Sequence, residues 1–212
     1  MELQKYLNDD LSQRVIMHGA DLPWIDSPSP GVQRRPLFRI GCEKARATTL
    51  VRYEPGSHFS THRHPRGEEF LVLEGVFEDE HGRYPVGSYV RNPPGSKHTP
   101  GGAQGCTIFV RLRQFDDHDN VQMSTHLNGQ PHQLLFENVH ERVSVERLQP
   151  SASLHLDNGR GLEVLVLDGS LEGDGFVLRP WSWMRLPAGM DLQAQAGSDG
   201  ARVWVKDASL QL

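Results

Sequence analysis

The chain of 212 residues has few cysteines, no long apolar runs and no excess of basic residues. Its two cysteines, Cys42 and Cys106, lie far apart and offer neither a disulfide framework nor a Cys-x-x-Cys site. No run approaches the roughly 18 consecutive apolar residues of a membrane-spanning helix. With 22 Lys and Arg against 27 Asp and Glu, the net charge of −5 provides no basic field to attract nucleic acid. We therefore expect no membrane span and no direct nucleic-acid partner.

The N-terminal residues contain no apolar stretch of the kind found in signal peptides, so the expected location is cytoplasmic. Glycine (21) and proline (14) are both frequent, and the apolar runs between them are short. This pattern favours many short strands joined by tight turns. The sequence therefore predicts an all-β protein.

Three potential metal ligands follow one another at strand spacing. His62, His64 and Glu68 stand at positions i, i+2 and i+6. Side chains alternate between the two faces of a strand, so these three residues share a face if the turn between them keeps the parity. Glu68 then opens an apolar run that ends at a glycine, which is typical of a strand followed by a turn.

A fourth potential ligand, His98, follows the turn residues Pro93, Pro94 and Gly95, which end a predicted strand over residues 87–92. From that position its imidazole can reach the inner face of the first strand. Three imidazoles and one carboxylate suit divalent zinc, iron, manganese or nickel rather than calcium. The sequence therefore predicts one divalent metal site, held by His62, His64, Glu68 and His98.

The spacing of these residues resembles that of a known superfamily. Gly56-x5-His62-x-His64-x3-Glu68-x6-Gly75 is similar to the first motif of the cupins. Gly87-x5-Pro93-x-Gly95-x2-His98 is similar to the second, although Gly102 stands where that pattern has asparagine. Residues 47–113 closely resemble the cupin domain of ChrR-type anti-sigma factors. The resemblance implies a double-stranded β-helix, or jelly roll, with zinc as the expected metal at the four ligand positions.

An internal repeat appears when the chain is shifted against itself by 94 residues. Residues 71–75 then fall on residues 165–169, with the sequences Leu-Val-Leu-Glu-Gly and Leu-Val-Leu-Asp-Gly. Glu69 falls on Glu163, and the Pro-x-Gly at 93–95 falls on that at 187–189. We interpret the chain as two tandem cupin barrels, a bicupin.

The second copy has lost the ligands. At the same offset the four ligand positions are occupied by Leu156, Asn158, Leu162 and Leu192. An apolar lining does not solvate a divalent ion, and the neighbours of His155 suggest no ligand set, so no metal is expected there. Three tryptophans of this half could line an aromatic ligand pocket, but we favour a role in the core or between the barrels; they are Trp181, Trp183 and Trp204.

These features predict four segments. Residues 1–40 form an N-terminal extension that packs on the barrels, anchored by Trp24. Residues 41–115 form the metal-binding barrel, residues 116–133 a linker, and residues 134–212 a degenerate second barrel without metal. The linker is rich in histidine, which makes a second metal site conceivable; irregular spacing favours a solvated linker instead. Its histidines are His118, His126 and His132.

Three functions remain open at this stage. The resemblance favours a regulatory, stress-sensing protein related to anti-sigma factors. The ligand set also suits a metal-dependent dioxygenase or related oxidoreductase that acts on a small molecule. The third alternative is a module that binds a small ligand without turnover. Sigma-factor binding is not expected, because the helical zinc domain that carries it in ChrR-type proteins needs a Cys-x-x-Cys pair that this chain lacks. A monomer and a homodimer are both compatible with the sequence.

No catalytic residue can be assigned from the sequence. Arg52 and Arg91 are candidates to hold an anionic substrate, with Arg52 placed on the ligand face by parity. Weaker candidates beside the site are Tyr53, Glu69 and Tyr89. We expect Phe70 and Val72 to line the barrel beside the metal. His58 and Cys106 would matter only for a redox sensor, and Cys106 begins what reads as a buried strand.

Overall fold

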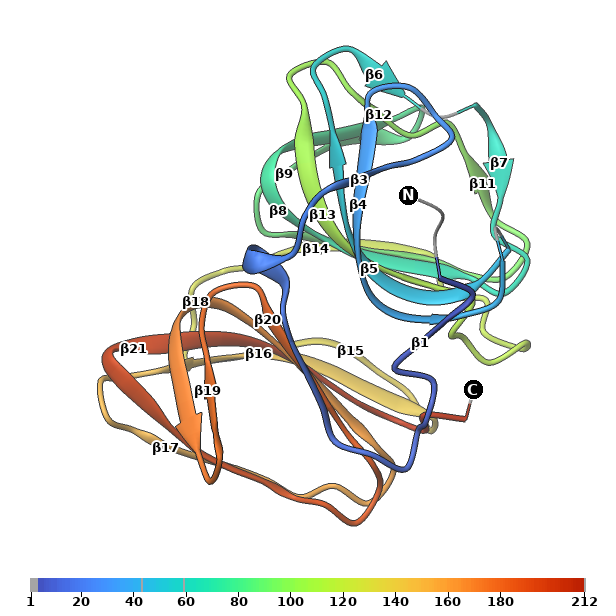
Figure 1. The fold of residues 1–212 in the computed structure, drawn as a ribbon. Coiled ribbons are helices and arrows are strands. Elements are labelled where there is room, and N and C mark those ends of the chain that lie inside the picture. The colour runs from blue at the N-terminus through green and yellow to red at the C-terminus, as the bar shows by residue number, and fades with distance from the viewer. Residues whose placement is uncertain (1–3, 43, 59, 212) are drawn as a thin grey trace. The chain divides into compact units, whose positions relative to one another are not determined.

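The computed structural model describes residues 4–42, 44–58 and 60–211, and β-strands dominate this part of the chain (Figure 1). Its single helical element is the short 3-10 helix η1 (Gly19–Asp21). None of the described helical segments is long and apolar enough to cross a membrane. The all-β prediction is confirmed. The chain divides into two compact units, Met1–Asp9 with Pro23–His126 and Asp10–Leu22 with Leu127–Leu212.

The first unit consists of an 11-stranded sheet and a separate two-stranded ladder. Its strands are β1 (Tyr6–Leu7), β3 (Ile25–Asp26), β4 (Val32–Ile40), β5 (Arg46–Tyr53), β6 (Ser57–His58), β7 (His62–Arg63), β8 (Glu68–Asp79), β9 (Gly82–Pro85), β10 (Ser88–Asn92), β11 (Lys97–His98), β12 (Gly101–Gly102), β13 (Cys106–Leu112) and β14 (Met123–His126). The main sheet runs in the order β1-β4-β5-β13-β8-β10-β14, and β11 pairs with β7 in the ladder.

The long strands of this unit are buried because both of their faces carry apolar side chains. Val51, Phe70, Val72, Ile108 and Val110 belong to one apolar cluster inside the barrel. Phe70 and Val72 thus line the barrel interior, as the sequence predicts. Close burial of these side chains provides most of the driving force for closing the sheet on itself.

The second unit contains one eight-stranded sheet. Its strands are β2 (Val15–His18), β15 (His132–Glu137), β16 (Glu141–Leu148), β17 (Ser153–Leu156), β18 (Leu162–Gly173), β19 (Phe176–Leu178), β20 (Ser182–Leu186) and β21 (Leu192–Ala208). The order is β15-β16-β21-β18-β20-β2, so a strand from the N-terminal segment forms one end of this sheet. Its interior is filled by an apolar cluster of leucine, valine, methionine and alanine side chains.

The observed units divide the chain at other places than the predicted segments. β4 lies in the predicted extension of residues 1–40, yet it pairs along its length with β5 and forms part of the first sheet. β14 lies in the predicted linker of residues 116–133, yet it pairs with β10. Residues 10–22 belong to the second unit. The pairing of β14 with β10 spans about 30 residues of intervening chain, whereas β4 and β5 are consecutive strands that the predicted boundary at residue 40 separates.

The 94-residue repeat is preserved in the pairing of the strands. His62 lies opposite His98 in the ladder of β7 and β11, and the equivalent residues Leu156 and Leu192 lie opposite each other on β17 and β21. Glu68 lies opposite Asn92 on β10, and their equivalents Leu162 and Leu186 form the matching pair on β18 and β20. The two sheets are therefore a tandem pair of jelly-roll barrels.

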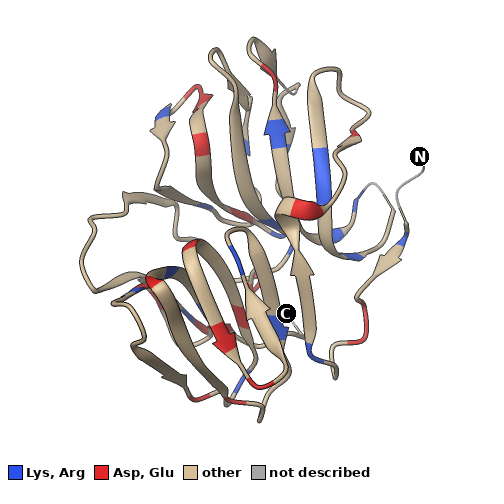
Figure 2. Cartoon of the chain, turned by 60° about the vertical axis from the view of Figure 1, so that its left-hand side comes forward, with Lys and Arg blue, Asp and Glu red and all other residues tan. Residues whose placement is uncertain are grey.

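Charged residues of both signs are interspersed along the strands and loops of each unit (Figure 2). This distribution agrees with the modest net charge of −5.

Candidate metal centre

The structure brings together the four residues that the sequence singles out. His62 lies on β7, His64 follows it directly, Glu68 is the first residue of β8, and His98 ends β11. Their potential ligand atoms all lie within 4.8 Å of one another. The backbone holds this arrangement, because the amide of His64 donates to the carbonyl of Ser96 at 2.9 Å and its carbonyl accepts from Gly95 at 2.8 Å.

The three imidazole rings surround one point with their edges directed at each other. The ring centroids are 4.8 Å apart for His62 and His64, 5.3 Å for His62 and His98, and 4.7 Å for His64 and His98. The Nε2 atoms of His64 and His98 lie 3.5 and 3.3 Å from the same carboxylate oxygen of Glu68. The lone pairs of three rings and a carboxylate thus converge from different strands.

Neighbouring acceptors fix which nitrogen of each ring is available. Nδ1 of His98 lies 3.1 Å from the carboxylate of Asp79, and Nδ1 of His62 lies 3.0 Å from the carbonyl of Ser60. Both partners accept hydrogen bonds, so Nδ1 carries the proton and Nε2 faces the centre. Such outer contacts set the tautomer and orientation of metal-binding histidines. Asn92 orients the fourth ligand by donating to Glu68 at 3.1 Å.

The site passes a direct test of whether a metal fits it. The Nε2 atoms of His64 and His98 are buried and make no hydrogen bond. A buried polar atom without a partner costs about 1–3 kcal/mol, so native proteins rarely leave two of them side by side. A divalent cation would satisfy both, and zinc, iron, manganese and nickel all accept imidazole and carboxylate ligands.

Burial and neighbouring charges shift the pKa values of the two buried histidines in opposite directions. Burial lowers the pKa of His64, and the nearby rings of His98 and His62 act in the same direction against Glu68. Burial alone would lower the pKa of His98 too, but Asp79 and Glu68 together raise it. Burial would raise the pKa of Asp79, but its hydrogen bonds with His98 and His81 lower it. Asp79 is therefore an ionised acceptor beside His98.

A cavity of about 380 Å³ opens next to the centre, inside the first barrel. Among the metal-site residues, His62 and Glu68 line it directly. Its other described lining residues come mainly from β4, β5 and β13; they are Ser29, Arg34, Pro36, Phe38, Arg39, Ala45, Ala47, Thr49, Val51, Tyr53, Ser60, Thr61, Ile108, Val110 and Leu112. The centre is thus accessible to a small molecule from the barrel interior.

Tyr53 is the cavity residue that the sequence names correctly as a neighbour of the site. Burial raises its pKa well above the usual value, and the charge of Glu68 raises it further. Arg34 acts on the same phenol in the opposite direction. The phenol is therefore protonated at neutral pH.

The prediction that Arg52 lies on the ligand face is wrong. Alternate residues of β5, including Thr49, Val51 and Tyr53, line the cavity, which places Arg52 on the opposite face. There its guanidinium stacks on Trp24 at 4.4 Å and donates to Gln33. The prediction placed Arg52 on the same face as His62 and His64 because all three positions are even-numbered. In the structure, β5 directs its odd-numbered side chains into the cavity.

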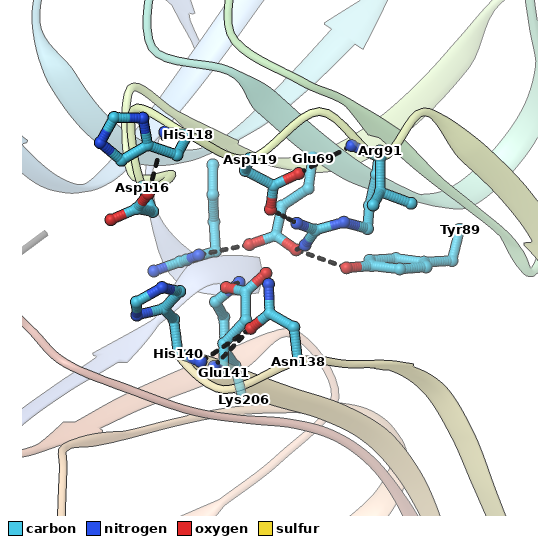
Figure 3. Close-up of polar contacts among 12 residues, drawn as sticks. Glu69, Tyr89, Arg91, Asp116, His118, Asp119, Asn138, His140, Glu141 and Lys206 are labelled. Carbon is cyan, nitrogen blue, oxygen red and sulfur yellow. Dashed lines mark hydrogen bonds and ion pairs between the residues drawn. The ribbon is translucent and has the colours of Figure 1, made fainter.

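Arg91 is not in the cavity either. Its side chain is fully buried, between Glu69 at 3.5 Å and Asp119 at 2.5 Å, and it stacks on Phe115 (Figure 3). Tyr89 donates to the same Glu69 carboxylate. The candidates Arg91, Glu69 and Tyr89 thus form a buried polar network on the other face of the sheet. Their charges are satisfied by each other and are not directed at a substrate.

Arg34 and Arg39 take the place that the sequence argument gave to Arg52 and Arg91. Both are on β4 and both line the cavity. The predicted boundary at residue 40 assigned β4 to an extension outside the barrel, so its inner face was not considered. The sequence does contain a signal for this strand, namely the strand-like segment 32–40. The alternation of side chains along it directs one of its arginines into the barrel.

The former ligand positions of the second barrel are filled by other interactions. Leu162 and Leu192 belong to its apolar cluster, and Leu156 packs against it. The side-chain amide of Asn158 donates to the carbonyls of Pro187 and Met190. The absence of metal from this barrel remains a prediction.

A second group of potential ligands was missed by the sequence argument. His155, Asp157 and Asp191 lie close together in the second unit, and all three are exposed. Their spacing follows no known motif, and only the fold unites Asp191 with the other two. Neither this group nor the first includes the predicted-linker histidines among the described residues; those are His118, His126 and His132.

Trp183 and Trp204 are fully buried, and Trp183 donates to Glu163 at 3.0 Å, which supports the structural interpretation of these tryptophans. Cys106 is buried as well, and burial raises the pKa of its thiol to about 12. A thiol of that pKa is protonated and unreactive at neutral pH, which disfavours a redox-sensing role. The side chain of His58 lies outside the described part of the structure.

Comparison with known proteins gives the fold and family. Residues 12–116 match the model of the ChrR cupin-like domain family. No match was found among curated protein sequences.

Several solved structures share the fold of the whole chain. The pirin YhhW of Escherichia coli, solved with nickel(II), superposes with a TM-score of 0.75 at 12% identity, covering 93% of this chain and 100% of the pirin. A protein from Nostoc punctiforme proposed to be a dioxygenase gives 0.74 at 14% identity, covering 95% and 85%. A cupin 2 conserved barrel domain protein from Leptotrichia buccalis gives 0.62 at 12% identity, covering 96% and 100%. At these identities the likeness establishes the fold alone.

Three findings agree: the four candidate ligands converge in a jelly-roll barrel, the family model matches residues 12–116, and solved structures superpose on nearly the whole chain. Residues 12–116 match the ChrR cupin-like domain family, and the chain has the tandem jelly-roll fold found in cupin structures.

Proposed function

We propose that this protein is a metal-dependent cupin oxidoreductase of the dioxygenase type, which acts on a small organic molecule bound in the first barrel. The observation that carries the proposal is the position of the ligands at the wall of a cavity of about 380 Å³. A structural metal site is closed by protein ligands, whereas a catalytic site keeps a position open. Four ligands of a six-coordinate ion leave two positions for substrate and dioxygen.

The chain's own residues would prepare this chemistry. His62, His64, Glu68 and His98 would hold the ion, which when bound supplies Lewis acidity and, if redox-active, a site for dioxygen chemistry. Asp79 keeps Nε2 of His98 directed at the ion. The protonated Tyr53 phenol lines the cavity beside Glu68. The apolar walls formed by Val51 and Ile108 exclude water from the substrate.

A second candidate function is regulation, and the match to the ChrR cupin-like family favours it. In this alternative, zinc and the same cavity would bind a signal molecule without turnover. A sigma-factor partner forms no part of the proposal. The two candidates differ in metal and in turnover, since zinc has no redox chemistry.

Metal analysis of the purified protein, combined with dioxygen electrode measurements, tests the proposal. The substrates would be a panel of diketones and aromatic ketones. About one iron, manganese or nickel per chain, with dioxygen uptake that depends on added substrate, supports the oxidoreductase. Stoichiometric zinc without uptake would instead favour the regulatory function. Equal uptake by the His64→Ala variant after its metal is lost would contradict both roles for the centre.

A further inference from the structure

One wall of the cavity in the first barrel carries no charged side chain. It is formed by inward side chains along β5 and its paired strand β13; they are Ala45, Ala47, Thr49, Val51, Ile108, Val110 and Leu112. Among these seven residues only Thr49 carries a hydroxyl, and that hydroxyl lies 3.0 Å from the carbonyl of Arg35 and 3.3 Å from that of Leu50. The backbone therefore takes its proton, and the wall as a whole favours the hydrocarbon part of a ligand.

The pairing of the strands connects this wall to the candidate metal centre. Leu112 on β13 lies opposite Glu68 on β8 and opposite Ala47 on β5, and all three residues line the cavity. They form one row across three neighbouring strands. Two strand spacings place Ala47 about 10 Å from Glu68 at the backbone. A molecule held at the metal centre can therefore extend along this row until it lies over Ala47.

The wall leaves most space at Ala45 and Ala47, which we call the alanine strip. Both residues are buried, so the space above them lies inside the barrel and not on its surface. The larger side chains of Phe38 on β4 and Leu112 on β13 line the cavity on the two sides of the strip.

The width of the alanine strip favours a particular shape of ligand. The strip is one strand wide, or about 4.8 Å. Carbon atoms pack against each other at about 4 Å, so an unbranched chain of methylene groups fits this width. A chain with a bulky branch would instead meet the flanking side chains, and overpacking of this kind is costly.

From this arrangement we infer that the cavity takes a small molecule with a metal-chelating head and an unbranched apolar chain, and that Ala47 determines which chains it admits. The head would bind at the centre formed by the four candidate ligands, and the chain would lie over the alanine strip. A cavity of about 380 Å³ is near the lower end of ligand sites, which span about 300–1,000 Å³, so the chain is short. The inference rests on the proposed function and adds the substrate class.

Two isomers test this inference on the unmodified protein. Nonane-2,4-dione and 6,6-dimethylheptane-2,4-dione have the same diketone head and the same atoms, and differ in whether the chain is straight or ends in a tert-butyl group. Isothermal titration calorimetry on the zinc-loaded protein would measure both dissociation constants, since zinc holds the head without redox turnover. We expect the straight isomer to bind at least about tenfold more tightly, because the branched isomer overpacks the strip.

A variant locates the source of the preference. Ala47→Leu fills the strip, so it should weaken the binding of nonane-2,4-dione about tenfold. It should leave the zinc content and the affinity for pentane-2,4-dione, which has the head without the longer chain, unaltered. Ala103→Leu is the matched control, because Ala103 is exposed and does not line this cavity. It should retain the native affinities for all the diketones.

Equal affinity for the two isomers, or no binding of nonane-2,4-dione at millimolar concentration, would overturn the inference whether or not the variant folds. Native affinity for nonane-2,4-dione in a folded Ala47→Leu protein would overturn the role of Ala47. The proposed oxidoreductase function fails by a different result, namely protein loaded with a redox-active metal that takes up no dioxygen. Binding and uptake are measured separately, so the two failures can be told apart.

Discussion

At the scale of single residues, the metal centre depends on partners that are not ligands themselves. Asp79 is buried and accepts a hydrogen bond from Nδ1 of His98, so it decides which nitrogen of the ring faces the ion. Asn92 has the same relation to Glu68. In the second barrel the residue equivalent to Asn92 is Leu186, opposite Leu162, so ligand and support have been replaced together.

The Asp79→Asn variant should bind metal about 10–100-fold more weakly than the native protein, which is the usual effect of removing such a partner. The amide has nearly the same shape but carries no charge and can present its NH2 group to the ring. Competition with a fluorescent chelator would measure the affinity. The exposed carboxylate Asp199 provides the control, and Asp199→Asn should change nothing. Equal affinities for all three proteins would show that Asp79 does not position His98.

The ligand residues could be found from the sequence because the motif places them at fixed distances from turn glycines and prolines. The cavity-lining arginines of β4 could not. Their assignment needs the register between β4 and β5 and the bulge in that pairing, which residue spacing alone does not fix. A single change of parity exchanges the faces of a strand, which is why Arg52 was placed inside and Arg34 was overlooked.

At the scale of secondary structure elements, the two barrels share a bulge at the same place in the repeat. The pairing of β8 with β13 shifts next to Glu74, and that of β18 with β21 shifts next to Asp168. The glycine that follows has a positive φ in each barrel, +68° at Gly75 and +70° at Gly169. A side chain at either residue would place its Cβ 2.1 Å from a backbone oxygen of the facing strand. The repeat thus preserves a constraint of the backbone.

Gly75→Ala and Gly169→Ala should each destabilise the protein, by at least the roughly 1–3 kcal/mol that a strained backbone conformation costs. The steric clash adds to this amount, since backbone cannot move aside cheaply. Thermal or urea unfolding followed by circular dichroism would measure the change. Gly159→Ala is the control, because no atom lies within 4 Å of the added carbon and its φ is not positive. Unaltered midpoints for the first two variants would contradict the described register.

The strands of the first barrel also carry a buried ionic network on the face away from the cavity. Arg91, Glu69 and Asp119 are all buried or nearly so at their charged ends. Glu163 and Arg185 lie opposite each other at the equivalent place in the second sheet, with Trp183 in the position of Tyr89. The repeat therefore keeps a buried glutamate opposite a buried arginine in both barrels, although the four candidate metal ligands lie in the first.

Arg91→Leu should lower the free energy of unfolding by about 3–5 kcal/mol, because it leaves buried carboxylates without their partner. It should leave the metal content per chain unaltered, since Arg91 lies outside the cavity. Urea unfolding and metal analysis of the same preparation would test both statements. Arg142→Leu, which removes an exposed pair with Glu137, should have little effect on either measurement. Loss of metal without loss of stability in Arg91→Leu would restore a role for Arg91 at the site.

At the scale of the whole molecule, both units have the jelly-roll fold, but the candidate metal ligands lie in the first unit. At the equivalent positions of the second unit they are replaced by leucines and an asparagine. The repeat, the all-β class and the barrel that carries the four candidate ligands could all be read from the spacing of glycine, proline and histidine. The division of the chain could not, because residues 10–22 join a sheet whose other strands all lie beyond residue 126. Nor could the exposed group of His155, Asp157 and Asp191, which only folding assembles.

The most direct test of this account is the number of metal ions per chain in the purified protein and in two histidine variants, measured by inductively coupled plasma mass spectrometry. The account predicts about one divalent ion per native chain, a value well below one for His98→Ala, and an unaltered value for His155→Ala. A native chain without metal would contradict the central claim, as would loss of the ion in His155→Ala with retention in His98→Ala.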